Sequence, residues 1–503
     1  MAAAAPANTT ITSVTAVPAD AELPGYCRVE GFVDTEITFE LRLPDPWNEK
    51  LLFLGSGGLA GVDPAEQFAG AAGNLQNGYA VVAPDTGHRG EITGDLTSPV
   101  YDPSWAYANT ERQINWAHRS LHVVTEAAKA IIGAHYGAPP QFSYFSGCSG
   151  GGRQAAMVAQ RYPEDFDGVV AGAPWLRVTN QVMAWTSIVQ TLTEAPVPPE
   201  KLSLIADAVM AACDATDGLE DGQVTDPRRC EFDPRELACG GGDGPDCLTE
   251  PELDSILKIY AGPSTSDGEK LFPGLVPGGE DRLWPNAIVH TETGGPGQLL
   301  GFLPDQFLRY FVFGPDYDLL TFDFDRDPWL LEPAADLFNV RPDLSAFRAA
   351  GGKMLMWHGW NDPRLSPWDS IRYRHDVIRE LRRTPRVVGD FFRLFMAPGV
   401  GHCGSGDAPN QLDPLAALEG WVEKGIAPER IVASQVDDAG ETVRTRPLCA
   451  YPGVAAYTGE GSIDDADSFV CVRDGHEGAP DWGRQGRDEG WHHGKDRDGH
   501  ARS

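Results

Sequence analysis

The chain has 503 residues, which is too long for one ordinary core, so we expect two or three folding units. Hydrophobic residues make up 42% and charged residues 22%, as in globular proteins, and no apolar run reaches the roughly 18 residues that a membrane span needs. The chain has 40 basic and 73 acidic residues, so its net charge is −33. Such a charge repels phosphate polymers and anionic bilayers, so we expect neither nucleic acid nor membrane as a partner.

The amino-terminal part of the chain predicts alternating strands and helices. Short apolar runs that end at glycine or proline turns are typical of buried strands, and longer runs with apolar residues at helical spacing are typical of helices. Strands are expected at residues 51–54, 79–83, 141–147 and 166–174, and helices at 109–135, capped by Asn109 or Thr110, and from 153 to the stop at Pro163. This order favours a parallel α/β sheet with helices on both faces.

The alternation stops after residue 175. Residues 176–335 are irregular and rich in Pro, Gly and Asp, and they hold four of the nine cysteines, which indicates a large insertion. Strand-then-loop patterns return at 351–363 and 392–404, with a helix at 366–381 between them. We therefore predict one α/β domain over 25–175 and 336–472, an inserted domain over 176–335, and a disordered polar tail over 473–503.

Six cysteines form close pairs beside polar or Gly-rich loops, as local disulfides do. These pairs are Cys213 with Cys230, Cys239 with Cys247, and Cys449 with Cys471. A zinc site is disfavoured because the chain has no C-x-x-C and its histidines do not cluster with these cysteines. We expect a secreted or periplasmic protein, although the start "MAAAAPANTT" shows no intact signal peptide.

Gly147-Cys148-Ser149-Gly150-Gly151 matches G-x-S-x-G between a predicted strand and a predicted helix. A sharp turn there would point the Ser149 hydroxyl away from the sheet, and the glycines would remove steric clashes. Ser149 is therefore the candidate nucleophile. The alternative is a purely structural glycine turn.

A serine nucleophile needs a base and an orienting carboxylate. His402 ends a strand-like run in "APGVGHCG", and Asp362 follows another strand in "MWHGWNDP". The order Ser149, Asp362, His402 is that of α/β-hydrolases. His358 also follows a strand, but we expect it to be a structural hydrogen-bonding residue.

Cysteines flank both catalytic motifs, since Cys148 precedes Ser149 and Cys403 follows His402. Folding that assembles the triad would bring the two sulfurs together, with Cα atoms within about 7 Å. A disulfide there closes a loop of about 255 residues and would stabilise the fold by about 4 to 5 kcal/mol in the chain-entropy model. It would also hold the base beside the nucleophile. Two free buried thiols are the alternative.

These motifs resemble the tannase and feruloyl esterase family, which also includes hydrolases of mono(2-hydroxyethyl) terephthalate. The resemblance rests on the two Cys-containing catalytic motifs, on "GGR" after the serine and on "HGWNDP", and it extends over about residues 25–472. It implies an α/β-hydrolase core, a large lid domain, a disulfide between the catalytic motifs and hydrolysis of esters of aromatic acids.

The resemblance also implies a structural Ca²⁺ in the lid. In "CDATDGLEDGQVTDPRRC", the carboxylates of Asp214, Asp217 and Asp221 offer hard oxygen ligands, and the resemblance adds the carbonyls of Leu219 and Gln223. A solvated acidic loop is the alternative reading.

An oxyanion hole needs backbone N–H donors, one from the residue after the nucleophile and one from an earlier loop. We expect Gly150 to supply the first and Gly58, or its neighbour Gly57, to supply the second. The chain departs from the family at two places. Cys27 has no cysteine partner near Ala60, and Gly150 stands where members tend to have a polar side chain.

We interpret the chain as a serine carboxylic ester hydrolase for small esters of aromatic or phenolic acids, of feruloyl esterase or tannase type. The alternatives are a hydrolase of terephthalate half esters, a Cys148 nucleophile, which a disulfide would disfavour, and a non-catalytic phenolic-binding protein. The sequence leaves the oligomeric state open. Lid aromatic residues could line an acyl pocket or form the lid's own core; these are Trp284, Phe307, Phe311, Phe313 and Trp329.

Overall fold

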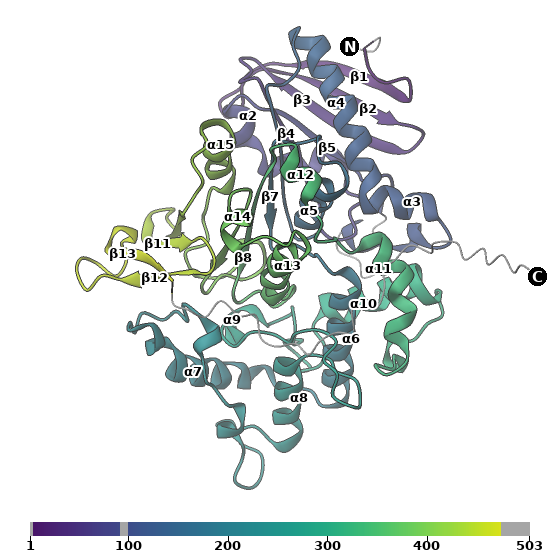
Figure 1. Ribbon diagram of the computed structural model, residues 1–503. Coiled ribbons are helices and arrows are strands. Elements are labelled where there is room, and N and C mark those ends of the chain that lie inside the picture. The colour runs from purple at the N-terminus through teal and green to yellow at the C-terminus, as the bar shows by residue number, and fades with distance from the viewer. Residues whose placement is uncertain (1–3, 91–98, 474–503) are drawn as a thin grey trace, which may run out of the picture.

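A nine-stranded mixed sheet forms the centre of the protein (Figure 1). The computed structural model describes residues 4–90 and 99–473. In spatial order the strands are β1 (Thr9–Val17), β2 (Tyr26–Val33), β3 (Ile37–Pro44), β5 (Ala80–Pro84), β4 (Lys50–Leu54), β6 (Phe142–Cys148), β7 (Gly168–Gly172), β8 (Lys353–Gly359) and β9 (Phe392–Ala397). From β5 to β9 all neighbours are parallel, as the alternation of strands and helices predicts, and the segments before and after the insertion join the same sheet.

The first three strands are antiparallel and extend the sheet beyond the predicted part. Strand β1 precedes residue 25, where the α/β domain was expected to begin, and its alternating half-buried and exposed residues are typical of an edge strand. The predicted tail lies almost wholly outside the described residues.

Helices cover both faces of the sheet, as expected. One face packs on α4 (Ser120–Tyr136), α5 (Gly150–Arg161), α12 (Ser345–Ala349), α13 (Pro367–Glu380) and α14 (Pro385–Gly389). The other face packs on α2 (Ala72–Gln76), which follows α1 (Pro64–Gln67), and on α15 (Pro414–Lys424). The helix expected at 109–135 consists of α3 (Thr110–Ile114), a π-helical turn and α4, and its N-cap is Asn109, which accepts a hydrogen bond from Arg112 N–H.

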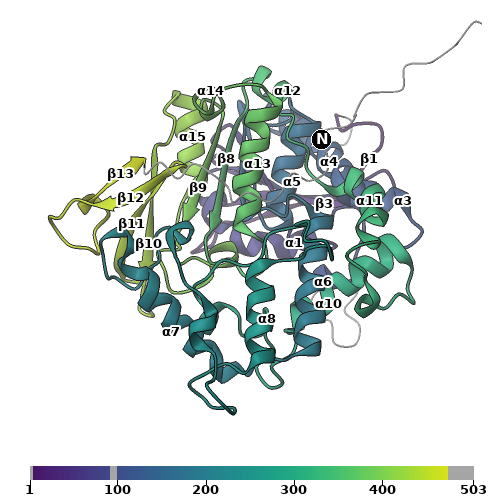
Figure 2. The ribbon, with the colours of Figure 1, turned by 60° about the horizontal axis from the view of Figure 1, so that its bottom comes forward.

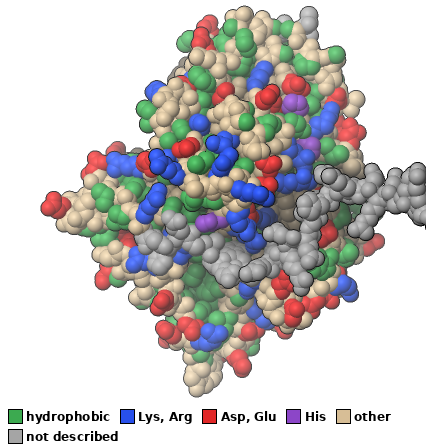
Figure 3. Space-filling model, in the orientation of Figure 1, with side chains coloured by type: hydrophobic (Ala, Val, Ile, Leu, Met, Phe, Trp, Pro, Cys, Tyr) green, Lys and Arg blue, Asp and Glu red, His purple; other side chains and the backbone are tan. Residues whose placement is uncertain are grey.

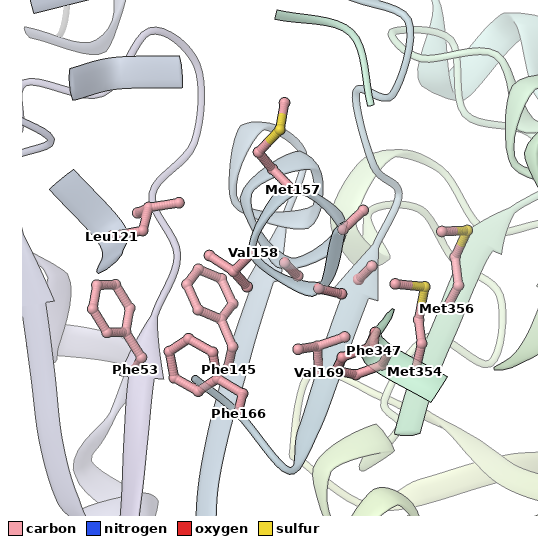
Figure 4. Close-up of a cluster of buried hydrophobic side chains, with 14 of the residues drawn as sticks. Phe53, Leu121, Phe145, Met157, Val158, Phe166, Val169, Phe347, Met354 and Met356 are labelled. Atoms are coloured by element: carbon pink, nitrogen blue, oxygen red, sulfur yellow. The ribbon is translucent and has the colours of Figure 1, made fainter. Parts of the chain in front are cut away.

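The core beneath α5 fixes the helix that follows the candidate nucleophile (Figure 4). Phe53 of β4 and Phe145 of β6 stack with ring centres 5.0 Å apart, and Phe166 meets both rings edge-on. Met157 and Val158 of α5 are fully buried in the same cluster. Because this helix is buried along most of its length, its first turn has a fixed position relative to the sheet.

The insertion, which is the predicted lid, is mainly helical, and its helices share one hydrophobic cluster with the loops that follow β4 and precede α4 (Figures 1 and 2). Its helices are α6 (Val178–Glu194), α7 (Leu202–Cys213), α8 (Glu250–Ala261), α9 (Glu280–Leu283), α10 (Gln298–Phe307) and α11 (Glu332–Phe338). The irregular pattern expected for residues 176–335 is therefore wrong at α6, which is a 17-residue helix. Its residues are buried on most sides, so the polar face that would have revealed a helical period is missing.

Two small hairpins complete the carboxyl-terminal part. Strands β10 (Arg430–Val436) and β11 (Thr442–Cys449) form one, and β12 (Gly453–Tyr457) and β13 (Phe469–Arg473) form the other. The disulfide between Cys449 and Cys471 joins the two hairpins, as predicted.

Candidate active site

Ser149 lies at a sharp turn between β6 and α5. Its backbone has φ 63° and ψ −122°, a region that costs a non-glycine residue about 1 to 3 kcal/mol. The turn is held by three backbone hydrogen bonds, since Ser149 N–H donates to Gly172 O (2.9 Å) and Ser149 O accepts from Arg153 N–H (3.0 Å) and Trp175 N–H (3.2 Å). Packing and hydrogen bonds thus keep Ser149 in the strained conformation that the glycine motif predicts.

The glycines around Ser149 allow backbones to pass very close to one another. A Cβ atom on Gly150 would lie 2.8 Å from Gly58 O, and one on Gly152 would lie 2.3 Å from Gly172 O. Both separations are shorter than real Cβ contacts. The loop after β4 therefore lies directly against the start of α5, and the absence of a side chain at Gly150 has a structural reason here.

Arg153, the arginine of the "GGR" motif, fixes the same helix from its other side. It is fully buried and donates to Trp116 O (3.1 Å) and Ala117 O (3.0 Å), which belong to the π-helical turn before α4. Its guanidinium also stacks over the Trp116 ring at 4.2 Å. The nucleophile helix is thus tied to α4 by hydrogen bonds as well as by packing.

Asp362 and His402 form the carboxylate–imidazole pair that the sequence predicts. His402 Nδ1 lies 2.8 Å from Asp362 Oδ2, and the Asp362 side chain is fully buried in the loop after β8. The other carboxylate oxygen accepts the backbone N–H groups of Arg364 (2.8 Å) and Leu365 (3.0 Å). These bonds fix the carboxylate, so His402 Nδ1–H donates to it and His402 Nε2 is left as the base.

His358 is a second imidazole on the same carboxylate. Its Nε2 lies 3.1 Å from Asp362 Oδ2 and 3.2 Å from Leu365 O, and both of these atoms are acceptors. Nε2 must therefore carry the proton, and the Ser370 hydroxyl donates to Nδ1 (2.8 Å). The ring is fully buried and held by all of these contacts, so His358 orients Asp362, in line with the hydrogen-bonding role expected for it.

The surroundings of Asp362 keep it ionised. Burial by itself raises the pKa of this carboxyl group, but the charge of His402 and the hydrogen bonds from both histidines outweigh burial and hold the pKa well below its usual range. A permanently charged Asp362 can stabilise the imidazolium that forms when His402 accepts a proton.

The disulfide between Cys148 and Cys403 joins the two catalytic motifs. The Cα atoms of these cysteines are 5.9 Å apart, within the limit set from the sequence, and 255 positions separate the residues in the chain. Cys403 has φ 53°, so each motif contains a residue in the left-handed region. Ser149 and His402 both line one pocket, and no hydrogen bond joins their side chains within residues 4–90 and 99–473. Such catalytic bonds are often loose without substrate.

Two backbone N–H groups beside Ser149 have the properties of an oxyanion hole. Gly150 begins α5, so its N–H has no partner within the helix. A Cβ atom on Gly150 would lie 3.0 Å from Gly58 N, which makes the two groups neighbours. In the described part of the chain neither N–H donates a hydrogen bond. Both donors expected from the sequence are therefore available to an anionic oxygen.

Two residues that the sequence did not reveal hold the loop of Gly58 in place. The buried Gln154 side chain accepts the Ser56 N–H (2.9 Å), which ties this loop to the nucleophile helix. His88 Nε2–H donates to Leu59 O (3.0 Å), and its ring stacks on Trp105 at 3.7 Å. Burial lowers the pKa of His88 to about 3, so the ring is neutral. No motif marks either residue, because each acts only through the folded loop.

A pocket of about 440 Å³ lies between the catalytic loops and the lid. Ser149 and His402 line it from the sheet side, Trp185 of α6 and Leu303 of α10 line it from the lid, and Trp175 lies between the two. The walls are mainly apolar and include two indole rings, a surface that suits a flat aromatic group.

The lid aromatics proposed from the sequence lie elsewhere. The rings of Trp284 and Phe307 are buried in the lid core, Phe311 stacks on Phe307 at 4.7 Å, and Trp329 is 63% exposed. None of the five candidates lines the pocket in the described structure. The pocket takes one indole from Trp185 of α6, in the stretch expected to be irregular, and the other from Trp175, at the end of the preceding α/β segment.

Arg364 is the one Lys or Arg that lines this pocket in the part of the chain described. Its backbone is fixed, because its N–H donates to Asp362 and its carbonyl accepts the Trp185 indole N–H (2.6 Å). The residue is half-buried, and its guanidinium has no ion pair among the described residues. It thus brings a positive charge without an ion pair in the described structure to a pocket whose walls are mainly apolar.

The predicted calcium loop is a compact turn closed by the Cys213–Cys230 disulfide. The Asp214 carboxylate accepts the backbone N–H groups of residues 221, 222 and 223 at 3.1 to 3.2 Å. Asp221 pairs with Arg446 through one oxygen, while its other oxygen is buried and has no hydrogen-bond partner in the described structure. Within residues 4–90 and 99–473, no group of three or more His, Cys, Asp or Glu side chains is arranged as a ready-made metal site.

The remaining cysteines behave as expected. Cys239 and Cys247 form the third local disulfide, which gives four in all, and Cys27 is a half-buried free thiol. In the described chain no helix combines the length and apolarity that crossing a bilayer requires.

Comparison with known proteins shows which family this chain is similar to. The model of the family described as tannase and feruloyl esterase matches residues 21–472. An uncharacterized esterase from Xanthomonas campestris is 36% identical, over 92% of this chain and 89% of its own length. A mono(2-hydroxyethyl) terephthalate hydrolase from Piscinibacter sakaiensis is 30% identical, over 90% of this chain and 85% of its own.

The fold also matches a solved structure. The crystal structure of feruloyl esterase B from Aspergillus oryzae superposes with a TM-score of 0.82 at 28% identity, covering 93% of this chain and 97% of that one. The α/β-hydrolase core and the resemblance predicted from the motifs are confirmed.

Removing the disulfide between the catalytic motifs should reduce both stability and activity. In the double variant Cys148→Ser/Cys403→Ser, we expect the free energy of unfolding to fall by up to about 5 kcal/mol, because a long loop is no longer closed. We also expect kcat to fall at least about tenfold at a temperature where the variant is folded. Denaturant unfolding and ester hydrolysis measure the two effects.

The matched control is Cys239→Ser/Cys247→Ser, which removes a disulfide that spans only 8 positions in the lid. It should leave kcat within about twofold of the native value. Equal loss of kcat in both variants would contradict a specific role for the link between the catalytic motifs.

Proposed function

The chain belongs to the tannase and feruloyl esterase family of carboxylic ester hydrolases, and we propose that it hydrolyses esters of aromatic acids through an acyl-enzyme on Ser149. The observation that carries this proposal is the buried Asp362–His402 pair, which a disulfide attaches to the Ser149 turn. An intact triad of this kind argues against the alternative of a binding protein without catalysis.

In the first half of the reaction His402 Nε2 takes the proton of the Ser149 hydroxyl, and Ser149 Oγ attacks the ester carbonyl. Asp362 stabilises the imidazolium. The negative charge that develops on the carbonyl oxygen is met by the N–H groups of Gly150 and Gly58. The imidazolium then gives its proton to the leaving alcohol as the C–O bond breaks, which leaves the acid esterified to Ser149.

The second half of the reaction repeats these roles with water. His402 removes a proton from water, the hydroxide attacks the acyl-enzyme, and the same two N–H groups hold the oxyanion. Ser149 leaves with the proton from His402, and the free acid is released. Cys148 cannot serve as the nucleophile in this scheme because its sulfur is bonded to Cys403.

The pocket supports an aromatic acyl group. Trp175 and Trp185 lie on its wall with Ser149, and the family description and the superposed feruloyl esterase both concern esterases of phenolic acids. We therefore infer that the acyl part of the substrate is a substituted aromatic acid whose ring packs against these indoles.

A half ester of an aromatic dicarboxylic acid is a second candidate substrate, and Arg364 is the observation that favours it. A free guanidinium at an apolar pocket would bind a second carboxylate by charge-assisted hydrogen bonds. The terephthalate half-ester hydrolase among the relatives is consistent with such a substrate.

We also propose that the Asp214 loop binds a structural Ca²⁺. Two features support this proposal. One carboxylate oxygen of Asp221 is buried without a hydrogen-bond partner in the described structure, and the backbone turns tightly around the Asp214 carboxylate. Asp214, Asp217 and Asp221 would hold the ion together with the carbonyls of Leu219 and Gln223. The ion would stiffen the lid and take no part in the reaction.

We further propose that the protein works outside the cytosol, and its four disulfides support this.

Removal of the nucleophile tests the proposed mechanism. Ser149→Ala should lower kcat/KM at least about a thousandfold on chromogenic and phenolic esters, because no acyl-enzyme can form. Ser405→Ala is the matched control, since Ser405 lines the same pocket but does not lie on the strained turn, and it should stay within about threefold of the native value. Equal turnover by the native protein and Ser149→Ala would refute the mechanism.

Arg364→Leu distinguishes the two candidate substrate classes. If the guanidinium binds a substrate carboxylate, KM for a terephthalate half ester should rise at least about tenfold, since a hydrogen bond to a charged group is worth about 1.5 to 3 kcal/mol. KM for the neutral methyl ester of a hydroxycinnamic acid should change less than about threefold. An equal change for both esters would contradict a role for Arg364 in recognising charge.

Thermal melting tests the calcium proposal without any activity measurement. Chelator should lower Tm by at least about 2 °C, and added Ca²⁺ should restore it, because the ion binds only the folded loop. Asp217→Asn, which can still accept the Leu219 N–H bond, should lose this response, whereas Asp246→Asn on an exposed lid turn should keep it. A native Tm that is unchanged by chelator would count against the ion.

A further inference from the structure

A strongly basic segment stands out in this acidic protein. Between residues 372 and 393 the chain carries seven arginines and three acidic residues, although the whole chain has a net charge of −33. The segment runs through the end of α13, through α14 and into β9. Lys and Arg side chains gather on the face that contains α13 and α14 in Figure 3.

Some of these arginines have structural ion pairs and others do not. Arg372 and Arg379 contact Asp376, and Arg393 pairs with Glu429 (2.9 Å). In contrast, Arg382, Arg383 and Arg386 are exposed and have no ion pair among the residues described, and the same holds for Arg473 at the end of β13. We call these four residues the free arginines. No ion pair within the fold accounts for their presence.

A cleft of about 460 Å³ separates α14 from the β12–β13 hairpin and brings arginines from both sides together. Arg386 and Arg393 line it from the α14 side, and Arg473 lines it from the hairpin. Arg374 also lines the cleft, together with the acidic residues Asp390 and Glu429, so positive charge exceeds negative charge there. The cleft shares no lining residue with the catalytic pocket in the described structure.

We propose that this face binds an anionic polymer that bears carboxylates on a chain of sugar rings, a polysaccharide of the polyuronate class. Each exposed arginine contributes less than about 1 kcal/mol to a single ion pair, so a small anion would bind weakly. A chain with repeated charges engages several arginines at once and gains affinity from effective concentration. The free arginines are spread over a turn, a helix and a hairpin, which matches a long ligand and not a compact one.

The shape and charge of the site select this polymer over other polyanions. The cleft is concave, and it is flanked by the rings of Pro385 and Pro452, which offer apolar surfaces to sugar rings. A bilayer is flat and would not enter it. Duplex DNA carries a charge about every 1.7 Å and would meet strong repulsion from the rest of this protein, whereas a polyuronate carries at most one charge per sugar. The proposal does not depend on the proposed catalytic mechanism.

Charge reversal in the full-length protein tests this proposal. Native protein should bind polygalacturonate in titration calorimetry at low ionic strength, with an affinity that falls as salt is added. Arg382→Glu/Arg386→Glu/Arg473→Glu should bind at least about tenfold more weakly. Arg235→Glu/Lys258→Glu/Arg326→Glu carries the same change of net charge on exposed lid positions and should bind within about twofold of native protein.

Turnover of a small neutral ester should be the same in native protein and both triple variants, which shows that they are folded. Equal weakening in the two variants would overturn the proposal, because net charge alone would then explain binding. The same conclusion would follow if polygalacturonate did not bind at low salt, or if duplex DNA or anionic vesicles bound native protein more tightly than the polyuronate.

Discussion

The disulfide between Cys148 and Cys403 is the constraint on which the candidate site depends. It joins the end of β6 to the loop after β9, two strands that are separated in the sheet by β7 and β8. His402 begins a short 3-10 turn after β9, and no backbone ladder connects this turn to the Ser149 turn in the described structure. The covalent link joins the two turns, while the hydrogen-bonded Asp362 sets the orientation of the ring.

The remainder of the site is built around the backbone of α5. Glycines at its start let the loop of Gly58 and the end of β7 approach within contact distance, and Gln154 and Arg153 tie the helix to that loop and to α4. The N–H donors for an oxyanion are therefore fixed by the packing that fixes the nucleophile. The inserted helices add Trp185 and Leu303 to the pocket wall. The candidate catalytic residues thus lie at the ends of sheet strands, and the inserted helices form part of the pocket wall.

Local sequence predicted the candidate catalytic residues, because each of them follows a predicted strand. Ser149, Asp362 and His402 could be named from strand ends, chain order and paired cysteines, and the parallel sheet followed from the alternation of strands and helices. Gln154 and His88 could not be found, because they act on a loop that is distant in sequence. The helical spacing of α6 could not be recognised because most of its residues are buried, so the position of Trp185 could not be predicted either. The antiparallel strand β1 lay outside the repeating pattern.

A structure of the protein inhibited by an aryl phosphonate would test the central claim most directly, because such a reagent leaves a tetrahedral adduct on the nucleophile. The account predicts phosphorus bonded to Ser149 Oγ, one phosphonyl oxygen within hydrogen-bond distance of Gly150 N and Gly58 N, and His402 Nε2 in contact with Ser149 Oγ. An adduct on another residue, or a phosphonyl oxygen directed away from both glycines, would contradict it.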